Sequence, residues 1–300
     1  MSHQLYPGYL NLKEEIHKRV EEGYNILRRC TLCGRQCKKN RFIERGICGG
    51  ELLPMVSSYN LHFGEEPPIS GSRGSGTVFF TGCSLSCVFC QNYPISQQRI
   101  GNEISIEKLA EYMLSLQYEG AHNINLVTPT HYVPQILASL ELAIEKGLSI
   151  PIVYNTGGYD SPETLSLLRG IVDIYLPDAK YSDDQLAFRY SGVKRYVDIN
   201  REAICEMHSQ VGELLVDEGI AVEGILVRHL VLPSHIENTR GVLQFLKTVS
   251  PDTKISLMGQ YFPCNRAKDY PEINQKLSTT EYREAVSIMH SLSLEGYIQG

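Results

Sequence analysis

Three cysteines in one short loop carry the clearest chemical signal in this chain. Cys83, Cys87 and Cys90 are spaced C-x3-C-x2-C and follow an apolar run, residues 76–82, that is typical of a β-strand. Three thiolates can hold three irons of a [4Fe–4S] cluster and leave the fourth iron open to a substrate or cofactor. A zinc site completed by a histidine is an alternative, although zinc ligands usually come as C-x2-C pairs. Three unrelated buried thiols are another. The clustering favours the iron–sulfur site.

A second group of cysteines lies nearer the amino terminus. Cys30, Cys33, Cys37 and Cys48 are spaced C-x2-C-x3-C-x10-C, which predicts a second metal site. Zinc would make this segment a closed structural knuckle, and its shortness favours that interpretation. An auxiliary [4Fe–4S] cluster would instead deliver electrons or bind substrate. The residues leave both metals open.

The same segment is strongly basic. Between positions 28 and 45 there are seven Lys or Arg residues and one acid, Glu44. These positive charges could offset the negative charge of a thiolate–metal site. This is the simpler interpretation, because runs of charged residues usually lie on the solvated surface. It could also form a docking patch for an acidic protein or an RNA.

Length and composition limit the remaining possibilities. A chain of 300 residues with 42% apolar residues suits one large α/β domain, with or without a small appendage. No stretch approaches the roughly 18 apolar residues of a membrane span, and the amino terminus lacks a secretory pattern. We therefore expect a cytoplasmic protein, whose nine cysteines are ligands or thiols rather than disulfides. A net charge of −6 gives no reason to expect a membrane or nucleic-acid partner.

The pattern of apolar residues divides the chain in two. Residues 1–75 contain a helical stretch around 12–27, the four-cysteine segment and a Gly/Pro/Ser-rich loop or linker at 62–76. Residues 76–300 alternate strands with helices, which predicts a partial (β/α)6 TIM-like barrel. The expected strands are 77–81, 123–127, 152–155, 172–176, 224–232 and 254–258. The three-cysteine loop would lie at the carboxyl end of the first barrel strand, where catalytic residues of such barrels gather.

Capping residues support the helices of this second part. Ser105 precedes a run with an apolar face at helical spacing, and Pro134 begins a helix that ends near Gly147. Ser161 and a first-turn proline begin the next one. Residues 278–281 form a capping-box pattern before the last helix.

The three-cysteine loop, with Phe89 just before its third cysteine, resembles the signature of the radical S-adenosylmethionine (SAM) superfamily. That resemblance implies a [4Fe–4S] cluster whose open iron binds the amino and carboxylate groups of SAM. It also implies reductive cleavage of SAM to methionine and a 5′-deoxyadenosyl radical that abstracts hydrogen.

Further motifs resemble the group related to pyruvate formate-lyase activating enzymes. In that group a four-cysteine segment precedes a Phe-Gly-Glu-Glu-Pro-Pro stretch and a Cys-Val-Phe-Cys-Gln-Asn loop, as it does here. The resemblance implies SAM contacts from the end of the third strand, namely Asn155, Thr156, Gly157 and Gly158. An ordinary glycine turn is the alternative for that segment.

The ends of the next two strands carry the candidate catalytic residues. Asp178 and Lys180 match a D-x-K element that lines the SAM or cation site in those enzymes, unless they are an incidental solvated pair. Arg228 lies within an apolar strand and needs an anionic partner, for which a SAM carboxylate is suitable. Strand alternation then places the neighbouring His229 on the outer face.

One element of the superfamily is absent. Many members have a Gly-Gly-Glu sequence after the second strand, whose glutamate holds the SAM amine. The matching segment here, residues 125–131, contains no acid, so the resemblance assigns that role to Thr128 and Thr130 with nearby carbonyls.

The sequence thus predicts a radical SAM enzyme, and the resemblance favours an activase that places a glycyl radical on a partner protein. Such an enzyme would need a reducing donor such as flavodoxin or ferredoxin. Two alternatives stay open: an enzyme acting on a small metabolite, a peptide or an RNA, and a non-catalytic iron–sulfur or zinc scaffold.

Overall fold

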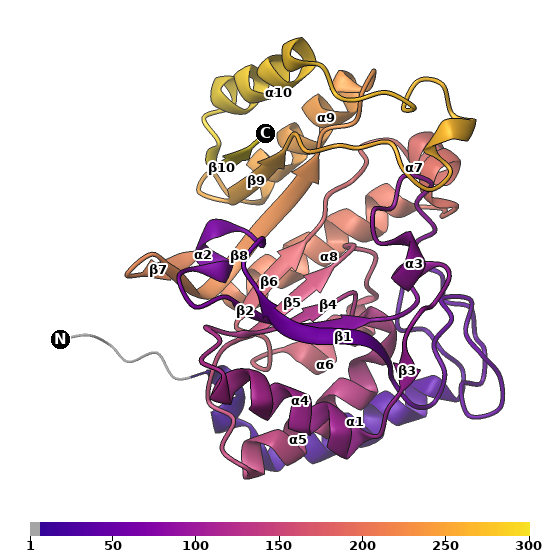
Figure 1. Cartoon of the computed structure of the whole chain (residues 1–300), viewed down its shortest axis with the longest axis vertical. Helices are drawn as coiled ribbons and strands as arrows, with labels where there is room; N and C mark the ends of the chain where they lie inside the picture. Colours follow the sequence, from indigo (N-terminus) through magenta and orange to yellow (C-terminus); the bar gives the residue numbers. More distant parts are fainter. Residues whose placement is uncertain (1–6) are drawn as a thin grey trace.

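Seven parallel strands form the centre of the molecule in the computed structural model, which describes residues 7–300 (Figure 1). They follow one another across the sheet in chain order, and the sheet ends at β10 on one edge and β3 on the other, so it stays open. This is the partial TIM-like barrel that the sequence predicts. The strands are β2 (Ser75–Phe80), β4 (Ile124–Val127), β5 (Ile152–Thr156), β6 (Ile174–Pro177), β8 (Ile220–Leu230), β9 (Lys254–Met258) and β10 (Glu295–Gln299).

All six predicted strands are present, and β10 adds a seventh. It pairs in parallel with β9 over its whole length, from Glu295 opposite Lys254 to Gln299 opposite Met258. Its sequence, Glu-Gly-Tyr-Ile-Gln, lacks the apolar run of a buried strand because β10 is an edge strand with no buried residue.

Helices connect the parallel strands and cover the outer face of the sheet. The predicted caps are confirmed: Ser105 and Ser161 each accept a backbone N–H of the first turn, and Ser278 with Glu281 forms a capping box. The helices are α1 (Lys13–Leu27), α2 (Pro67–Ser70), α3 (Tyr93–Ser96), α4 (Ile106–Tyr118), α5 (Val133–Glu145), α6 (Pro162–Leu168), α7 (Asp184–Ser191), α8 (Tyr196–Val211), α9 (Ile236–Val249) and α10 (Thr279–Ser291).

The segment expected as a loop or linker at 62–76 is more ordered than its composition indicates. β1 (Met55–His62) pairs antiparallel with β2, β3 (Asn102–Glu103) pairs with β1, and the short β7 (Leu215–Asp217) pairs with β8. The helix α2 follows β1, and its Ile69 is fully buried against β5, β6 and β8. Ile69 and the hydrogen bond from the Asn123 side chain to its carbonyl help to fix this segment to the sheet. The division at residue 75 stays a prediction.

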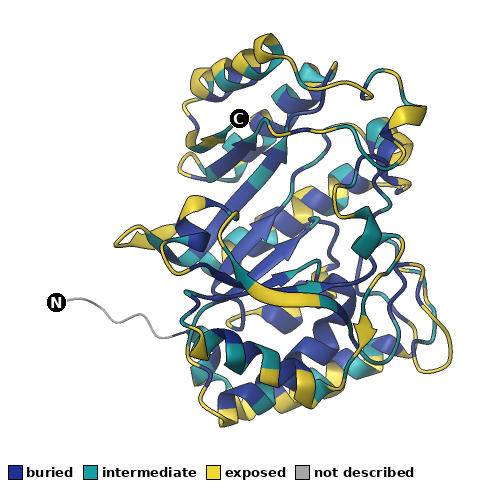
Figure 2. Cartoon of the chain, viewed as in Figure 1, coloured by how far each residue is buried: buried dark blue, intermediate teal, exposed yellow. Residues whose placement is uncertain are grey.

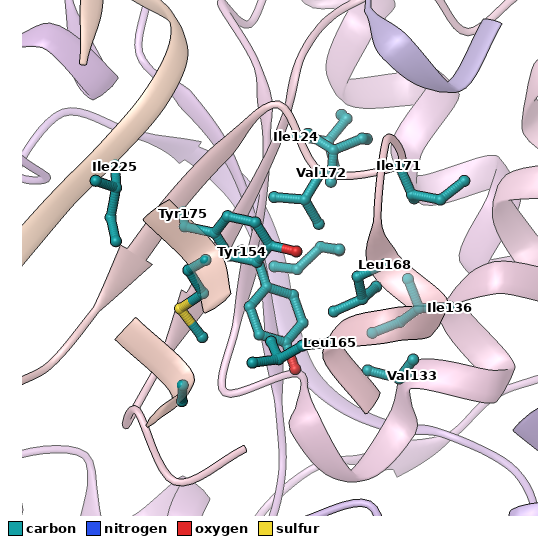
Figure 3. Close-up of a cluster of buried hydrophobic side chains, with 14 of the residues drawn as sticks. Ile124, Val133, Ile136, Tyr154, Leu165, Leu168, Ile171, Val172, Tyr175 and Ile225 are labelled. Carbon is teal, nitrogen blue, oxygen red and sulfur yellow. The ribbon is translucent and has the colours of Figure 1, made fainter. Parts of the chain in front are cut away.

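The main hydrophobic core lies between the sheet and the outer helices (Figures 2 and 3). Tyr154 of β5 and Tyr175 of β6 stack edge-to-face there, with ring centroids 5.8 Å apart. The hydroxyl of Tyr154 donates to Asp160, in the loop after β5, at 2.8 Å. The core therefore fixes the loop at the carboxyl end of β5 as well as the strand itself.

Candidate active site at the carboxyl ends of the parallel strands

The loop after β2 presents the three predicted cluster ligands. Gly82 begins the loop with φ of +81°, and a Cβ there would approach the Cys48 carbonyl oxygen to 2.4 Å, so only glycine fits. The Cys83 N–H donates to that same carbonyl at 3.0 Å. Ser86 N–H donates to the Ser191 carbonyl at 3.1 Å, which ties the middle of the loop to the end of α7.

The three thiols are free; Cys87 is buried, and Cys83 and Cys90 are partly buried. Cys87 Sγ lies 2.9 Å from the Ser191 hydroxyl, and Cys90 Sγ lies 3.2 Å from the Ser96 hydroxyl. Burial raises the pKa of all three thiols, and the Lys180 ammonium opposes this effect. A bound metal would overcome the burial cost by deprotonating them.

This donor set fits a cluster better than a single ion. In the described part of the chain, the four-cysteine segment included, no group of three or more His, Cys, Asp or Glu side chains converges as a site for one metal ion. The cysteines of an iron–sulfur cube each bind a different iron, so they need not converge on one point. Three soft thiols on one buried loop, beside apolar Leu85 and Val88, match that requirement.

The predicted catalytic residues in β8 and just after β6 form one partly buried ion-pair network. Asp178 accepts from Arg228 Nε at 2.9 Å and from Lys180 Nζ at 2.5 Å. Burial alone would raise the pKa of Asp178, but the two cations outweigh it and lower that pKa. His229 lies on the other face of β8, bonded to Thr239 of α9 as strand alternation predicts. The network therefore holds charged groups near the carboxyl ends of β6 and β8.

Glu65 completes this network from outside the barrel strands, and sequence reasoning missed it. Its carboxylate accepts from Arg228 at 3.2 Å, Asn155 at 2.8 Å and Asn125 at 3.0 Å. Arg228 in turn donates to the Asn155 side-chain oxygen at 2.6 Å. The available signal was a pair of acids, Glu65 and Glu66, in a segment otherwise made of turn residues.

The glycine turn after β5 packs directly on the cluster loop. A Cβ on Gly157 would meet Leu85 at 2.9 Å, and one on Gly158 would meet the Asp178 carbonyl oxygen at 2.4 Å. Gly158 has φ of +69°, and Asn200 donates to its carbonyl at 2.9 Å. Gly157 thus allows the loop after β5 to approach the cysteine loop, and Gly158 allows it to approach the loop after β6.

Thr128 and Thr130, which the family resemblance assigns to the SAM amine, lie beside the end of β5. Thr130 is buried, and its hydroxyl donates to Asp160 at 2.7 Å, as does the Thr156 hydroxyl. Thr128 has φ of +59°, and its N–H donates to the Asn155 carbonyl at 2.8 Å. The hydroxyl of Thr130 is therefore already engaged, and its contact with SAM stays a prediction.

Phe89, within the cluster loop, lies beside residues at the carboxyl ends of the parallel strands. Its ring packs at 5.9 Å from that of Tyr261 and 6.4 Å from that of Tyr190. It also lines a cavity of about 10 Å³ together with Asp178, Lys180, Leu230, Leu232 and Met258. That volume is close to one water molecule, so SAM would enter only with movement of these side chains.

The four-cysteine segment is docked on both loops just described. Gly34 N–H donates to the Tyr159 carbonyl at 3.0 Å, and Ser161 N–H donates to the Leu32 carbonyl at 3.3 Å. Burial raises the pKa of Cys30 and Cys33, while backbone N–H groups directed at their sulfurs lower it. Figure 1 shows this indigo segment beside α3, which follows the cluster loop.

Two more structural facts bear on the sequence predictions. All nine cysteines are free thiols. Among the described residues, none of the helices combines the length and apolar character needed to cross a membrane.

Comparison with known proteins agrees with the predicted family and fold. Over residues 77–246 the chain matches the family described as the radical SAM superfamily. It is 32% identical to the uncharacterised protein MJ0674 of Methanocaldococcus jannaschii, over 96% of this chain and 80% of that protein.

Solved structures share the fold at low sequence identity. SuiB of Streptococcus suis bound to the precursor peptide SuiA is 14% identical, with a TM-score of 0.50 over 73% of this chain and 46% of that one. The chain thus spans about half the length of SuiB. SuiB bound to SAM gives 15% identity and a TM-score of 0.49 over 73% and 45% of the two chains. The family match, over more than half of the chain, shows that this chain belongs to the radical SAM superfamily.

Proposed function

We propose that this chain binds a [4Fe–4S] cluster on Cys83, Cys87 and Cys90 and reductively cleaves SAM. The bound cluster would supply one electron, which splits SAM into methionine and a 5′-deoxyadenosyl radical able to abstract hydrogen. The observation that carries this proposal is the ion-pair network of Asp178, Lys180 and Arg228, which lies directly beside the cysteine loop.

The residues of this network have the charges that SAM requires. The Lys180 ammonium and the Arg228 guanidinium would bind the SAM carboxylate, and the Asp178 and Glu65 carboxylates would accept hydrogen bonds from its amine. Glu65 thereby supplies the acid that residues 125–131 lack. Asn155, Thr156, Gly157 and Gly158 would contact the rest of the cofactor, and Phe89 would shield it from water.

Anaerobic reconstitution tests the proposal. The protein is loaded with iron and sulfide, reduced with dithionite and mixed with SAM, and its paramagnetic resonance spectrum and 5′-deoxyadenosine are measured. We expect a reduced-cluster signal that SAM alters, with 5′-deoxyadenosine released. A cluster that ignores SAM would instead favour a non-catalytic scaffold or an electron carrier.

Within this class, we propose that the substrate is a glycine of a partner protein. The support is the resemblance of the Asp178–Lys180 element and of the turn at 155–158 to the activating-enzyme group. A glycyl radical signal that appears only when enzyme, SAM and partner are combined would support the activase. Turnover with a small metabolite, a peptide or an RNA, without such a signal, would replace it.

We also propose that Cys30, Cys33, Cys37 and Cys48 hold a second metal. Backbone N–H groups directed at Cys30 and Cys33 support thiolate ligation in this segment. Elemental analysis of the purified protein distinguishes the two candidates. One zinc per chain would indicate a structural knuckle, and about four irons beyond the first cluster would indicate an auxiliary cluster.

A cytoplasmic location belongs to the same proposal, because nine free thiols suit a reducing compartment. There a flavodoxin or a ferredoxin would reduce the cluster.

A further inference from the structure

The four-cysteine segment contains a buried positive charge that the site described above does not use. Arg41 is 2% exposed, although residues 42–45 after it lie at the surface. Its Nη1 donates to the His131 carbonyl at 3.2 Å and its Nη2 to the Glu51 carbonyl at 2.7 Å, whereas its Nε has no hydrogen-bond partner. Burying a guanidinium in this way is costly unless an anion compensates its charge.

No carboxylate among the described residues forms an ion pair with Arg41. The acids of its own segment have other partners: Glu44 pairs with Lys39 at 2.7 Å, and Glu51 pairs with Arg45. The two backbone carbonyls satisfy N–H groups of Arg41 but bring no negative charge. The anion that this buried cation needs must therefore come from another kind of group.

The titratable groups that the barrel packs against Arg41 are neutral as well. Its guanidinium carbon lies 5.7 Å from the centre of the Tyr132 ring. Burial raises the pKa of Tyr132 to about 12 and lowers the pKa of His131 to about 3. At neutral pH Tyr132 is thus an uncharged phenol and His131 an uncharged imidazole. The groups near Arg41 that can still become anionic are thiols.

The thiols lie close enough to Arg41 to supply that charge. Arg41 Cδ and Cys48 Sγ lie 3.3 Å and 3.2 Å from the point that a Cβ on Gly46 would occupy, and a Cβ on Gly50 would clash with the guanidinium. Neither glycine has a left-handed backbone, so the space that Arg41 fills explains the absence of a side chain there. Burial raises the pKa of Cys30, and the Arg41 charge opposes that effect.

Both metals considered for this segment would give the charge that Arg41 needs. Four thiolates carry four negative charges, and either Zn²⁺ or a [4Fe–4S]²⁺ core offsets two of them. A loaded site therefore keeps two negative charges in excess. Protonated thiols carry none and would leave the Arg41 charge uncompensated.

We propose that Arg41 is the counter-cation of a metal–tetrathiolate centre on Cys30, Cys33, Cys37 and Cys48. The inference rests on the proposed second metal and adds the residue whose charge retains it. Loading breaks four S–H bonds, forms four metal–sulfur bonds and releases the four protons to solvent, with no thiol oxidised. Arg41 is not a ligand and acts through its charge. It stabilises the loaded segment and destabilises the metal-free one.

The test compares Arg41→Gln with Arg41→Lys, because both keep an N–H donor and only the lysine variant keeps the charge. The matched control is Arg29→Gln, which removes an exposed positive charge next to Cys30. Elemental analysis measures zinc and iron per chain, and the metal that is absent from Cys33→Ala is assigned to the segment. Competition with a chelator measures how tightly that metal is held, and scanning calorimetry gives the melting temperature before and after its removal.

We expect Arg41→Gln to hold the metal of the segment about tenfold more weakly than wild type, with Arg41→Lys and Arg29→Gln close to wild type. The melting temperature should change in opposite directions in the two states. Arg41→Gln should melt below wild type when the metal is bound, and above wild type after its removal, because no buried charge is then left uncompensated. A side chain that only packs and donates hydrogen bonds would lower the melting temperature in both states when replaced.

Equal metal retention by wild type and Arg41→Gln would overturn the inference. An equal loss in Arg29→Gln would overturn it too, because the overall charge of the segment would then be responsible. If Arg41→Gln does not fold, Arg41→Lys decides: weakening of about tenfold despite its retained charge contradicts the inference. The proposed second metal fails separately, when wild type contains neither zinc nor iron beyond the first cluster, and the inference then falls with it. The inference alone fails when wild type holds the metal and the variants hold it equally well.

Discussion

The two cysteine groups of this chain differ in what surrounds their thiols. Cys87 and Cys90 face side-chain groups, the Ser191 and Ser96 hydroxyls, and Lys180 contributes a positive charge. Backbone N–H groups are directed at sulfurs of both groups: at Cys83 and Cys90 in the first, and at Cys30 and Cys33 in the second. A loop of three thiols beside a partly buried ion-pair network suits a metal that reacts. Four thiols in one short segment suit a metal that holds structure or relays electrons.

The two groups also touch, so the comparison can be tested by removing one at a time. The Cys48 carbonyl accepts the N–H of Cys83, and Arg35 contacts the Ser84 carbonyl. If each group has its own metal, loss of one should leave the other loaded. If the two form one site, both metals should disappear together.

Cys87→Ala should have the largest effect. Removing one of three ligands leaves a cube with two protein thiolates, so we expect loss of the SAM-binding cluster and no detectable 5′-deoxyadenosine. Iron content and the paramagnetic resonance spectrum measure the first, and chromatography measures the second. The protein should stay folded, and the metal of the four-cysteine segment should stay bound. Full SAM cleavage by this variant would refute the ligand assignment.

Cys33→Ala comes next and acts on the other group. We expect it to remove the second metal and to lower the melting temperature, because residues 32–34 dock on the loop after β5. Elemental analysis and differential scanning calorimetry measure these effects. Cys205→Ala, at an exposed position on α8, is the control and should change neither. Unchanged metal content in Cys33→Ala would show that the segment binds none.

Local spacing explains why so much of the site was predictable. The cysteine loop, the glycine turn and the Asp178–Lys180 pair each lie within a few residues of a strand end, and parallel strands bring such ends together. The partial barrel followed from the alternation of apolar runs and helix caps. β10 was missed because an edge strand of five residues needs no apolar run.

Contacts between distant segments were not predictable from a single sequence. Glu65 lies 163 residues from Arg228, and no periodicity connects them. The contact of Asp160 was equally unpredictable. Asp160 accepts a hydrogen bond from the Thr130 hydroxyl, which the family resemblance assigns to SAM. The four-cysteine segment gave its metal-site signal through spacing, whereas its contact with Tyr159 and Ser161 required the fold.

Glu65→Gln therefore tests how far the ion-pair network of Asp178, Lys180 and Arg228 depends on a residue outside the barrel strands. The variant keeps the size of the side chain but removes the charge that Arg228 and Asn155 face. Loss of a buried hydrogen bond to a charged group costs about 1.5–3 kcal/mol, which should be visible in urea unfolding. Glu295→Gln is the control, because its ion pair with Lys254 is exposed and should contribute little to stability. The affinity for SAM should also fall in Glu65→Gln alone. Equal unfolding free energies for both variants would contradict the structural role of Glu65.

Glu66 should make the stability of the fold depend on pH. Its side chain is 3% exposed and its Oε2 has no hydrogen-bond partner. Burial and the neighbouring Glu65 carboxylate, against the attraction of Arg228, raise the pKa of Glu66 from 4.5 to about 8. Between these two values the folded state keeps a proton that the unfolded state has lost. Its stabilising effect is thus complete below pH 4.5 and disappears as the pH rises toward 8.

The unfolding free energy of wild type should therefore fall with rising pH across this range, by up to about 1.4 kcal/mol per pH unit from this group. Glu66→Gln cannot lose a proton there, so its profile should be flatter, whereas the control Glu295→Gln should keep the wild-type slope. Urea unfolding at several pH values between 5 and 8 measures all three. Parallel profiles for wild type and Glu66→Gln would show that Glu66 is ionised in the folded protein. The segment before β2 would then bring two negative charges, rather than one, to the Arg228 side of the barrel. With one negative charge from this segment, the two acids Asp178 and Glu65 balance the two cations Lys180 and Arg228, whereas the four-cysteine segment has an excess of positive charge. A second negative charge on Glu66 would remove that balance.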